Sequence, residues 1–236
     1  MSGIEPRLEV FHAPTPNGWK VTICLEEMGL PYTLLPVRLG HDLPEGFLES
    51  SPNGKIPALI DREGPDGKPI ALFESAAILL YLSHKTGRFI DPDPAGRFAV
   101  IQWLIWQVAG LGPMAGQNGH FLLYAPEPIP YAIDRYGKEV RRLYKVLDQQ
   151  LERTGAFVAG EDYSIADMAC FPWIITHKKQ GLRLDDYPAL KAWFAQVRAR
   201  PAVQRGIAAG GGVDAMRNQS LSVEEKNRLF RWNENP

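Results

Sequence analysis

A turn near the start of the chain contains the residues best placed to do chemistry. An apolar segment ends at Phe11, a Pro-rich turn follows, and Asn17-Gly18 opens a predicted helix. The first backbone N–H groups of a helix have no partner within it, so they point at whatever occupies the turn. Such a position favours an anion, and a thiolate is one. Because Thr, Pro, Asn and Gly all form turns readily, an ordinary turn is the plain alternative.

The hydrophobic pattern predicts the elements that position this turn. Residues 7–12 and 32–39 predict strands on either side of a helix over residues 18–27. Residues 56–60 and 69–73 predict two further strands joined as a hairpin with a long loop. A helix over residues 74–85 follows. The order β-α-β and then β-β-α is the layout of a thioredoxin-like fold, in which helices cover the faces of a small mixed sheet.

The remainder of the chain predicts helices only. Residues 88–95 contain two Pro residues and no periodicity, which indicates a linker. The predicted organisation is therefore a first domain over residues 1–87, an all-helical domain over residues 96–205 and a C-terminal extension over residues 206–236.

Three features mark helices of the second domain. Residues 96–108 are apolar almost all the way round, which predicts burial on several sides and leaves contact with another subunit as one option. The run Gly110-Leu111-Gly112-Pro113 predicts a kink or a helix end. Ser164 predicts a helix cap, and Asp167, three residues later, reaches back in a capping box.

Composition argues against several classes of protein. The 236 residues are 45% hydrophobic with a net charge of −1, so the chain can bury a core but offers no basic field for nucleic acid or an anionic membrane. The N-terminus lacks the pattern of a signal peptide, and Cys24 and Cys170 lie far apart in apolar surroundings, which favours a reducing compartment. We expect a cytoplasmic protein. The five His residues lack metal-ligand spacing, so no metal is expected.

Motifs in both halves of the chain resemble those of the cytosolic glutathione transferases. More narrowly, they resemble the bacterial Nu class, which is related to the fungal nitrogen-regulator-like transferases. The motifs, spread over roughly residues 8–201, are A-P-T-P-N-G, S-P-N-G-K-I-P-A, L-F-E-S-A-A-I-L-L-Y-L, L-G-P-M-x-G-Q, I-P-Y-A-I-D-R-Y and Y-S-I-A-D-M-A. The resemblance implies an α/β thioredoxin-like domain followed by an all-helical domain, a homodimer, and glutathione as co-substrate.

The resemblance also implies how the glutathione thiol is held. Thr15 and Asn17 stand where other transferase classes have a Tyr, Ser or Cys, and their hydroxyl and amide would favour the thiolate by donating to the sulfur. Ile56 precedes Pro57, which resembles the family's cis-proline, and would pair its backbone with the cysteinyl unit.

The two ends of glutathione are assigned in the same way. Ser75 would bind the γ-glutamyl carboxylate and Glu74 its ammonium, while Lys55 would meet the glycyl carboxylate. Arg135, off the apolar stripe of a helix predicted over residues 131–152, would pair with a glutathione carboxylate. A helix cap, a solvated Lys and a solvated Arg are the plain alternatives.

These residues favour a glutathione-dependent disulfide-bond reductase. The glutathione thiolate would attack a small disulfide without help from an enzyme cysteine, since Cys24 lies well inside its helix. Two alternatives stay open. The same thiolate could attack carbon in a glutathione S-transferase, or a glutathione lyase, acting on an apolar aromatic electrophile or thioether. The chain could also be a non-enzymatic glutathione-binding regulator.

Overall fold

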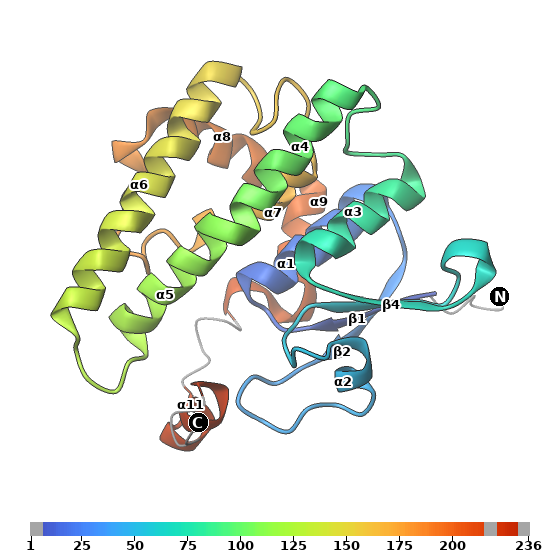
Figure 1. The fold of residues 1–236 in the computed structure, drawn as a ribbon, viewed down its shortest axis with the longest axis horizontal. Helices are drawn as coiled ribbons and strands as arrows, with labels where there is room; N and C mark the ends of the chain where they lie inside the picture. Colours follow the sequence, from blue (N-terminus) through green and yellow to red (C-terminus); the bar gives the residue numbers. More distant parts are fainter. Residues whose placement is uncertain (1–6, 215–220, 231–236) are drawn as a thin grey trace. The chain divides into compact units, whose positions relative to one another are not determined.

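The computed structural model describes residues 7–214 and 221–230 (Figure 1). Parts of the predicted first domain and of the predicted extension, residues 1–6, 215–220 and 231–236, lie outside the described residues. The chain divides into two compact units. The first combines Met1–Ile78 with Arg205–Pro236, and the second is Leu79–Gln204.

A four-stranded mixed sheet forms the centre of the first unit. Its strands are β1 (Leu8–His12), β2 (Tyr32–Pro36), β3 (Ala58–Asp61) and β4 (Ile70–Phe73). They lie in the order β2-β1-β3-β4, with β1 and β2 parallel and the other two neighbouring pairs antiparallel. This is the predicted thioredoxin-like arrangement. The second strand ends at Pro36 instead of extending to residue 39.

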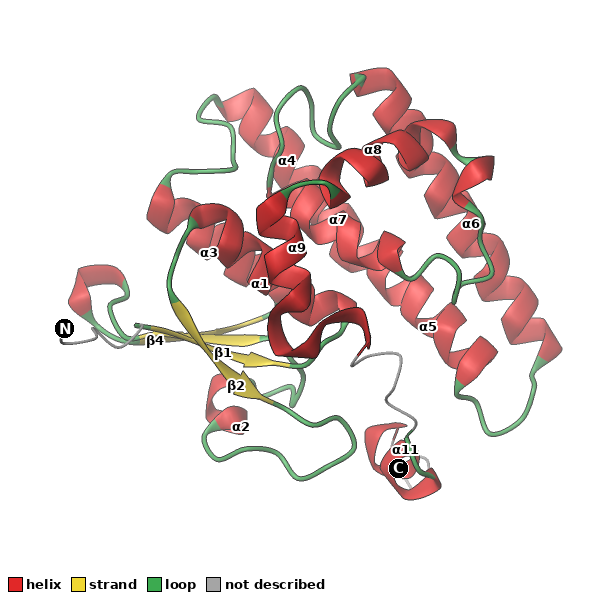
Figure 2. Cartoon of the chain, turned by 180° about the vertical axis from the view of Figure 1, so that it is seen from behind, coloured by secondary structure: helices red, strands yellow, loops and turns green. Residues whose placement is uncertain are grey.

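Helices cover both faces of this sheet. The crossover between the parallel strands is α1 (Pro16–Met28), which has Pro in its first turn and ends at Gly29 with a left-handed φ of 66°. Figure 2 shows α1 on one face of the sheet and the short α2 (Phe47–Ser50) on the other. The helix α3 (Ser75–Thr86) starts directly after β4.

The C-terminal part of the chain returns to the first unit. Residues from Arg205 onwards belong to it. The Thr22 hydroxyl donates to the backbone O of Gly206 at 2.7 Å, and Arg205 Nε donates to Glu26 Oε2 at 2.7 Å. A Cβ at position 206 would lie 2.6 Å from backbone atoms of Ile23, so only glycine allows this close approach to α1.

The second unit is built from helices. They are α4 (Pro94–Trp106), α5 (Gly112–Leu123), α6 (Pro130–Thr154), α7 (Ile165–Ile175) and α8 (Pro188–Arg198). Two later helices are α9 (Pro201–Ala208), which crosses from the second unit to the first, and α11 (Val223–Phe230) in the first. Short 3₁₀ helices cover Pro65–Gly67, Leu184–Asp186 and Ala209–Gly211.

The first long helix of this unit begins earlier than the sequence predicts. Asp93 caps α4 by accepting from the backbone N of Ala95 at 3.0 Å and of Gly96 at 3.4 Å, and Pro94 is the first helical residue. The last two residues of the predicted linker are therefore helical, because an Asp cap followed by Pro starts a helix.

Of the predicted kink or helix end at residues 110–113, the helix end is wrong. A π-helical turn over Gln107–Leu111 joins α4 to α5, so one helix continues through Pro113. An inserted residue in a π turn frees the position where the Pro ring would meet a carbonyl. The resulting 30-residue helix has a stretch of mean hydropathy 1.3, of which 33% is buried. By length and composition alone this helix could cross a membrane, and core helices of soluble proteins have the same length and composition.

The predicted capping box is confirmed at the start of α7. The Ser164 side chain accepts from the backbone N of Ala166 at 3.3 Å. The fully buried Asp167 carboxylate accepts from three N–H groups: the backbone of Val158 at 2.9 Å and of Ser164 at 3.0 Å, and Trp193 Nε1 at 2.8 Å. One carboxylate thus joins the helix start to a preceding loop and to α8.

Candidate functional site

The turn between β1 and α1 contains Thr15 and Asn17, the two residues predicted to donate to the glutathione sulfur. Thr15 is the N-cap of α1, and its Oγ1 accepts from the backbone N of Gly18 at 3.3 Å. A hydroxyl that accepts one bond keeps its own proton for a ligand. Asn17, in the first turn, is half-buried beside it. A Cβ on Gly18 would lie 2.2 Å from the Ala13 carbonyl oxygen, so glycine is required for this tight turn.

The loop before β3 contains the predicted backbone partner. The Ile56–Pro57 peptide bond is cis, as the resemblance implied. Ser51 Oγ donates to the carbonyl of Lys55 at 2.8 Å, which fixes the loop from the other side. Pro57 is buried, Ile56 is half-buried and Lys55 is exposed.

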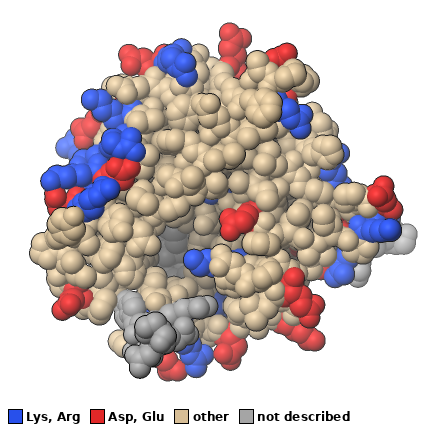
Figure 3. Space-filling model, in the orientation of Figure 1, with Lys and Arg blue, Asp and Glu red and all other residues tan. Residues whose placement is uncertain are grey.

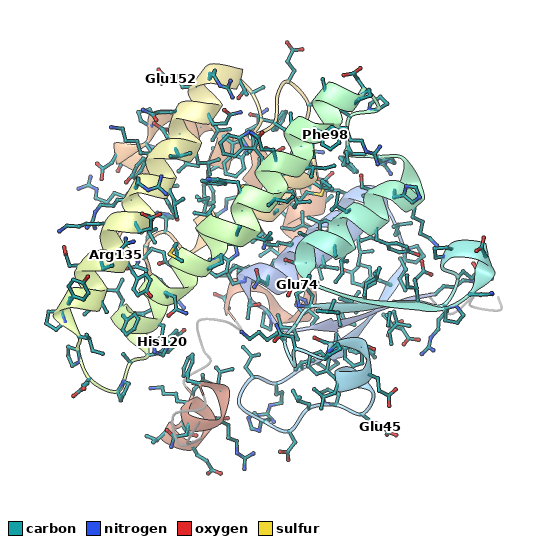
Figure 4. All side chains as sticks on the ribbon, in the orientation of Figure 1. Glu45, Glu74, Phe98, His120, Arg135 and Glu152 are labelled. Carbon is teal, nitrogen blue, oxygen red and sulfur yellow. The ribbon has the colours of Figure 1, made fainter. Side chains whose placement is uncertain are left out.

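The junction of β4 and α3 holds the next predicted pair, and Figure 4 labels Glu74 there. Glu74 is exposed and has a left-handed φ of 69°, a conformation that costs free energy for a residue other than Gly and that clusters at functional sites. Ser75, the first residue of α3, is buried, and its Oγ accepts from Lys20 Nζ at 3.2 Å.

The strand register brings these three segments to one end of the sheet. Phe11 pairs with Ala58, and Ala58 pairs with Phe73. The C-terminal end of β1, the start of β3 and the C-terminal end of β4 therefore form one row. Two strand spacings cover about 10 Å, which is about the length of three extended residues. The three segments can therefore contact one ligand of about this length.

Arg135, the last of the predicted site residues, lies in the second unit. It is on α6, where Figure 4 labels it, with a 58% exposed side chain 3.8 Å from Glu139 Oε2. Figure 3 shows basic and acidic side chains interspersed along α6, which includes the pairs Lys138–Asp134 and Arg142–Glu139. That face presents no surface of a single sign.

Neither cysteine is placed to act as a nucleophile. Cys24 and Cys170 form no disulfide, and both are fully buried. Burial, with a smaller contribution from Glu27, raises the pKa of the Cys24 thiol far above its ordinary value. A thiol that stays protonated at neutral pH is a poor nucleophile.

The loop after β2 is covered by a later helix. His41 Nε2 lies 2.6 Å from Glu225 Oε1 of α11, and Arg228 Nη1 donates to Asp42 Oδ1 at 3.5 Å. A Cβ on Gly40 would lie 2.7 Å from the backbone O of Glu225. The loop and α11 are therefore in contact through both their side chains and their backbones.

Two buried polar residues of this unit are absent from the sequence-based site. Lys20 in α1 is 1% exposed and His12 at the end of β1 is 2% exposed. The signal for Lys20 is a lysine inside an otherwise apolar run, W-K-V, at the start of a helix. Among the described residues, no group of three or more His, Cys, Asp or Glu side chains is arranged to hold a metal ion.

His12 gives a pH-dependent stability. Burial lowers its pKa from 6.5 to about 4, against smaller opposite effects of the Ala209 and Gly18 backbone. The unfolded chain therefore binds a proton between these values that the folded protein does not. Folding stability is full above pH 6.5, and about 3 kcal/mol of it is lost as the pH falls to 4.

We expect His12→Gln to remove this loss. Urea unfolding gives the decrease in the free energy of unfolding from pH 7 to pH 4. We expect this decrease to be about 3 kcal/mol larger in wild type than in His12→Gln. The exposed His84→Gln variant is the control and keeps the wild-type decrease. Equal decreases in wild type and His12→Gln would contradict the assignment.

Comparison with known proteins gives matches in both halves of the chain. Residues 15–85 match the family described as "Glutathione S-transferase, N-terminal domain". Residues 114–201 match "Glutathione S-transferase, C-terminal domain".

Individual relatives cover most of the chain. The disulfide-bond oxidoreductase YfcG of Escherichia coli (strain K12) is 50% identical over 204 residues, which are 85% of this chain and 94% of the relative. A glutathione transferase from Burkholderia graminis, solved with two glutathione molecules per subunit, is 45% identical with a TM-score of 0.81, covering 86% of this chain and 88% of that one. Another from Pseudomonas putida, solved with one glutathione disulfide per subunit, is 40% identical with a TM-score of 0.83, covering 89% and 94%.

Proposed function

The chain belongs to the glutathione S-transferase family, and we propose that it is a glutathione-dependent disulfide-bond reductase. The observation that carries this proposal is the row of three segments at one sheet end, with a donor turn at one side and no reactive cysteine. The name of the Escherichia coli relative and the glutathione disulfide in the Pseudomonas putida structure agree with it.

The row accommodates glutathione in one direction. The sulfur lies at the α1 turn, where Thr15 and Asn17 donate to it. The Ile56 backbone pairs with the cysteinyl unit, since Ile56 lies just before Ala58, the first paired residue of β3. The γ-glutamyl end lies at Glu74 and Ser75, at the far side of the row.

Two charged side chains complete the proposed set. Lys55 is exposed beside the loop and meets the glycyl carboxylate. Arg135 keeps its proposed role toward a glutathione carboxylate, because its guanidinium is exposed and its ion pair with Glu139 is long at 3.8 Å.

The reaction needs two glutathione molecules. The first thiolate attacks one sulfur of a small disulfide, forms a mixed disulfide and releases one thiolate. A second glutathione thiolate attacks the glutathione sulfur of the mixed disulfide, which forms glutathione disulfide and releases the other thiolate. The substrate gains two electrons and two glutathiones lose one each. The turn lowers the pKa of the attacking thiol by hydrogen bonding and by the helix N-terminus.

A cysteine-free variant tests this function. We expect the double variant Cys24→Ala, Cys170→Ala to reduce hydroxyethyl disulfide with glutathione at a rate within threefold of wild type, because neither thiol reaches solvent. Turnover of a chloronitrobenzene by the same preparations measures the competing attack on carbon. Loss of reductase activity in a folded double variant, or turnover of the chloronitrobenzene alone, would overturn the reductase.

The assembly is proposed to be a homodimer in the cytoplasm. Phe98 and Ile105 on α4 are 68% and 53% exposed and lie two helical turns apart on one face. Exposed large apolar side chains on one helix face favour contact with a second copy. Analytical ultracentrifugation measures the dimer, and a monomer at micromolar concentration would contradict it.

A further inference from the structure

A lysine ammonium is buried beneath the start of α3. Lys20 belongs to α1, is 1% exposed, and donates from Nζ to Ser75 Oγ at 3.2 Å. Lysine is almost never fully buried unless its charge is paired, because the ammonium loses its hydration. The Lys20 Nζ is thus held next to Ser75 at the start of α3.

This contact decides which way the Ser75 hydroxyl points. The ammonium of Lys20 has only donors, so the Ser75 oxygen must accept from it. The one proton of that hydroxyl is then left to donate elsewhere. Since Ser75 is the first residue of α3, the N–H groups of the same helix turn also lack partners within the helix. The hydroxyl and the N–H groups are all donors, and together with the ammonium they favour an anion.

We propose that Lys20 is the positioning residue for the γ-glutamyl end of glutathione. It holds the Ser75 hydroxyl as a donor and offsets the negative charge of the γ-glutamyl α-carboxylate. This rests on the proposed function, in which Ser75 binds that carboxylate. Since α1 also provides the turn of Thr15 and Asn17, one helix positions both the sulfur and the γ-glutamyl end. Lys20 therefore makes the site select γ-glutamyl thiols over thiols without that carboxylate.

The test compares two ligands on three variants. Isothermal titration measures the dissociation constants of glutathione and of its analogue with the γ-glutamyl α-carboxylate converted to a carboxamide. We expect Lys20→Met to weaken glutathione at least tenfold and the carboxamide less than twofold, and Lys20→Arg to recover glutathione to within threefold of wild type. Lys68→Met, the same change at an exposed lysine of the first unit, leaves both constants unchanged.

Kinetics give a second reading. Lys20→Met raises the KM for glutathione at least tenfold and keeps kcat at saturating glutathione within threefold, because the charge acts on binding and not on the sulfur. Circular dichroism checks folding, and if Lys20→Met does not fold, Lys20→Gln against Lys20→Arg takes its place.

The outcomes separate the possible failures. A folded Lys20→Met variant that binds glutathione within twofold of wild type overturns the proposal. An equal loss for both ligands also overturns it, because that pattern is the signature of a merely structural lysine. Wild-type protein that binds neither ligand overturns the proposed function itself, while wild type that binds glutathione with unchanged variants overturns only the role of Lys20.

Discussion

Replacing Asn17 by Ala lowers kcat/KM for glutathione in disulfide reduction by roughly 10- to 100-fold. In the proposed function the amide of Asn17, in the first turn of α1, donates to the glutathione thiolate, and a single hydrogen bond to a charged group is worth about that factor. The pKa of bound glutathione rises in parallel, which ultraviolet absorbance of the thiolate measures as a function of pH.

Two substitutions in the same turn serve as controls. Thr15→Ser keeps both the hydroxyl and the cap to Gly18, so we expect activity within threefold of wild type. Asn17→Asp keeps the size but places a negative charge at the sulfur, so it falls below Asn17→Ala. Activity of Asn17→Ala within twofold of wild type would remove the turn from the chemistry.

Asp167→Ala has the largest expected effect on stability, a loss of about 3–5 kcal/mol in the free energy of unfolding. The variant leaves three buried N–H groups without their acceptor: those of Val158, Ser164 and the Trp193 indole. For a chain of this size, the melting temperature falls by roughly 10 °C. Differential scanning calorimetry measures it at pH 8, since burial raises the pKa of Asp167 to about 6 and the carboxylate is then charged.

An exposed aspartate of the same unit is the matched control. Asp185 pairs with Lys191 at 2.7 Å on the surface, where solvent screens the pair, so Asp185→Ala leaves the free energy of unfolding nearly unchanged. A difference between Asp167→Ala and Asp185→Ala below about 1 kcal/mol would contradict the role of the buried carboxylate.

Local patterns were sufficient to predict the thioredoxin-like order of strands and helices and the family. The strands, the helix end at Gly29 and the Ser164–Asp167 capping box are each indicated by residues close together in the sequence. The structure confirms all of them. The matches to both glutathione S-transferase domains confirm the family resemblance, and a similar protein was solved with glutathione bound. The cis bond before Pro57 followed from the resemblance and is present.

Three features were beyond local patterns for physical reasons. The π turn at Gln107–Leu111 depends on where one extra residue is inserted, which Gly and Pro alone do not reveal. The buried contact of Lys20 with Ser75 joins residues 55 positions apart, and a lone lysine is usually solvated. The start of α4 was predicted too late, because the two Pro residues near Asp93 also fit a linker.

The return of the chain to α1 sets an order on biosynthesis. Arg205 and Gly206 bind Glu26 and Thr22, yet they follow the whole of the second unit. Residues 79–204 must leave the ribosome first, which takes on the order of ten seconds at usual rates. The first unit, although its strands are translated first, waits for these packing contacts until Arg205 and Gly206 have been made, so a fragment that stops before Arg205 lacks part of that unit.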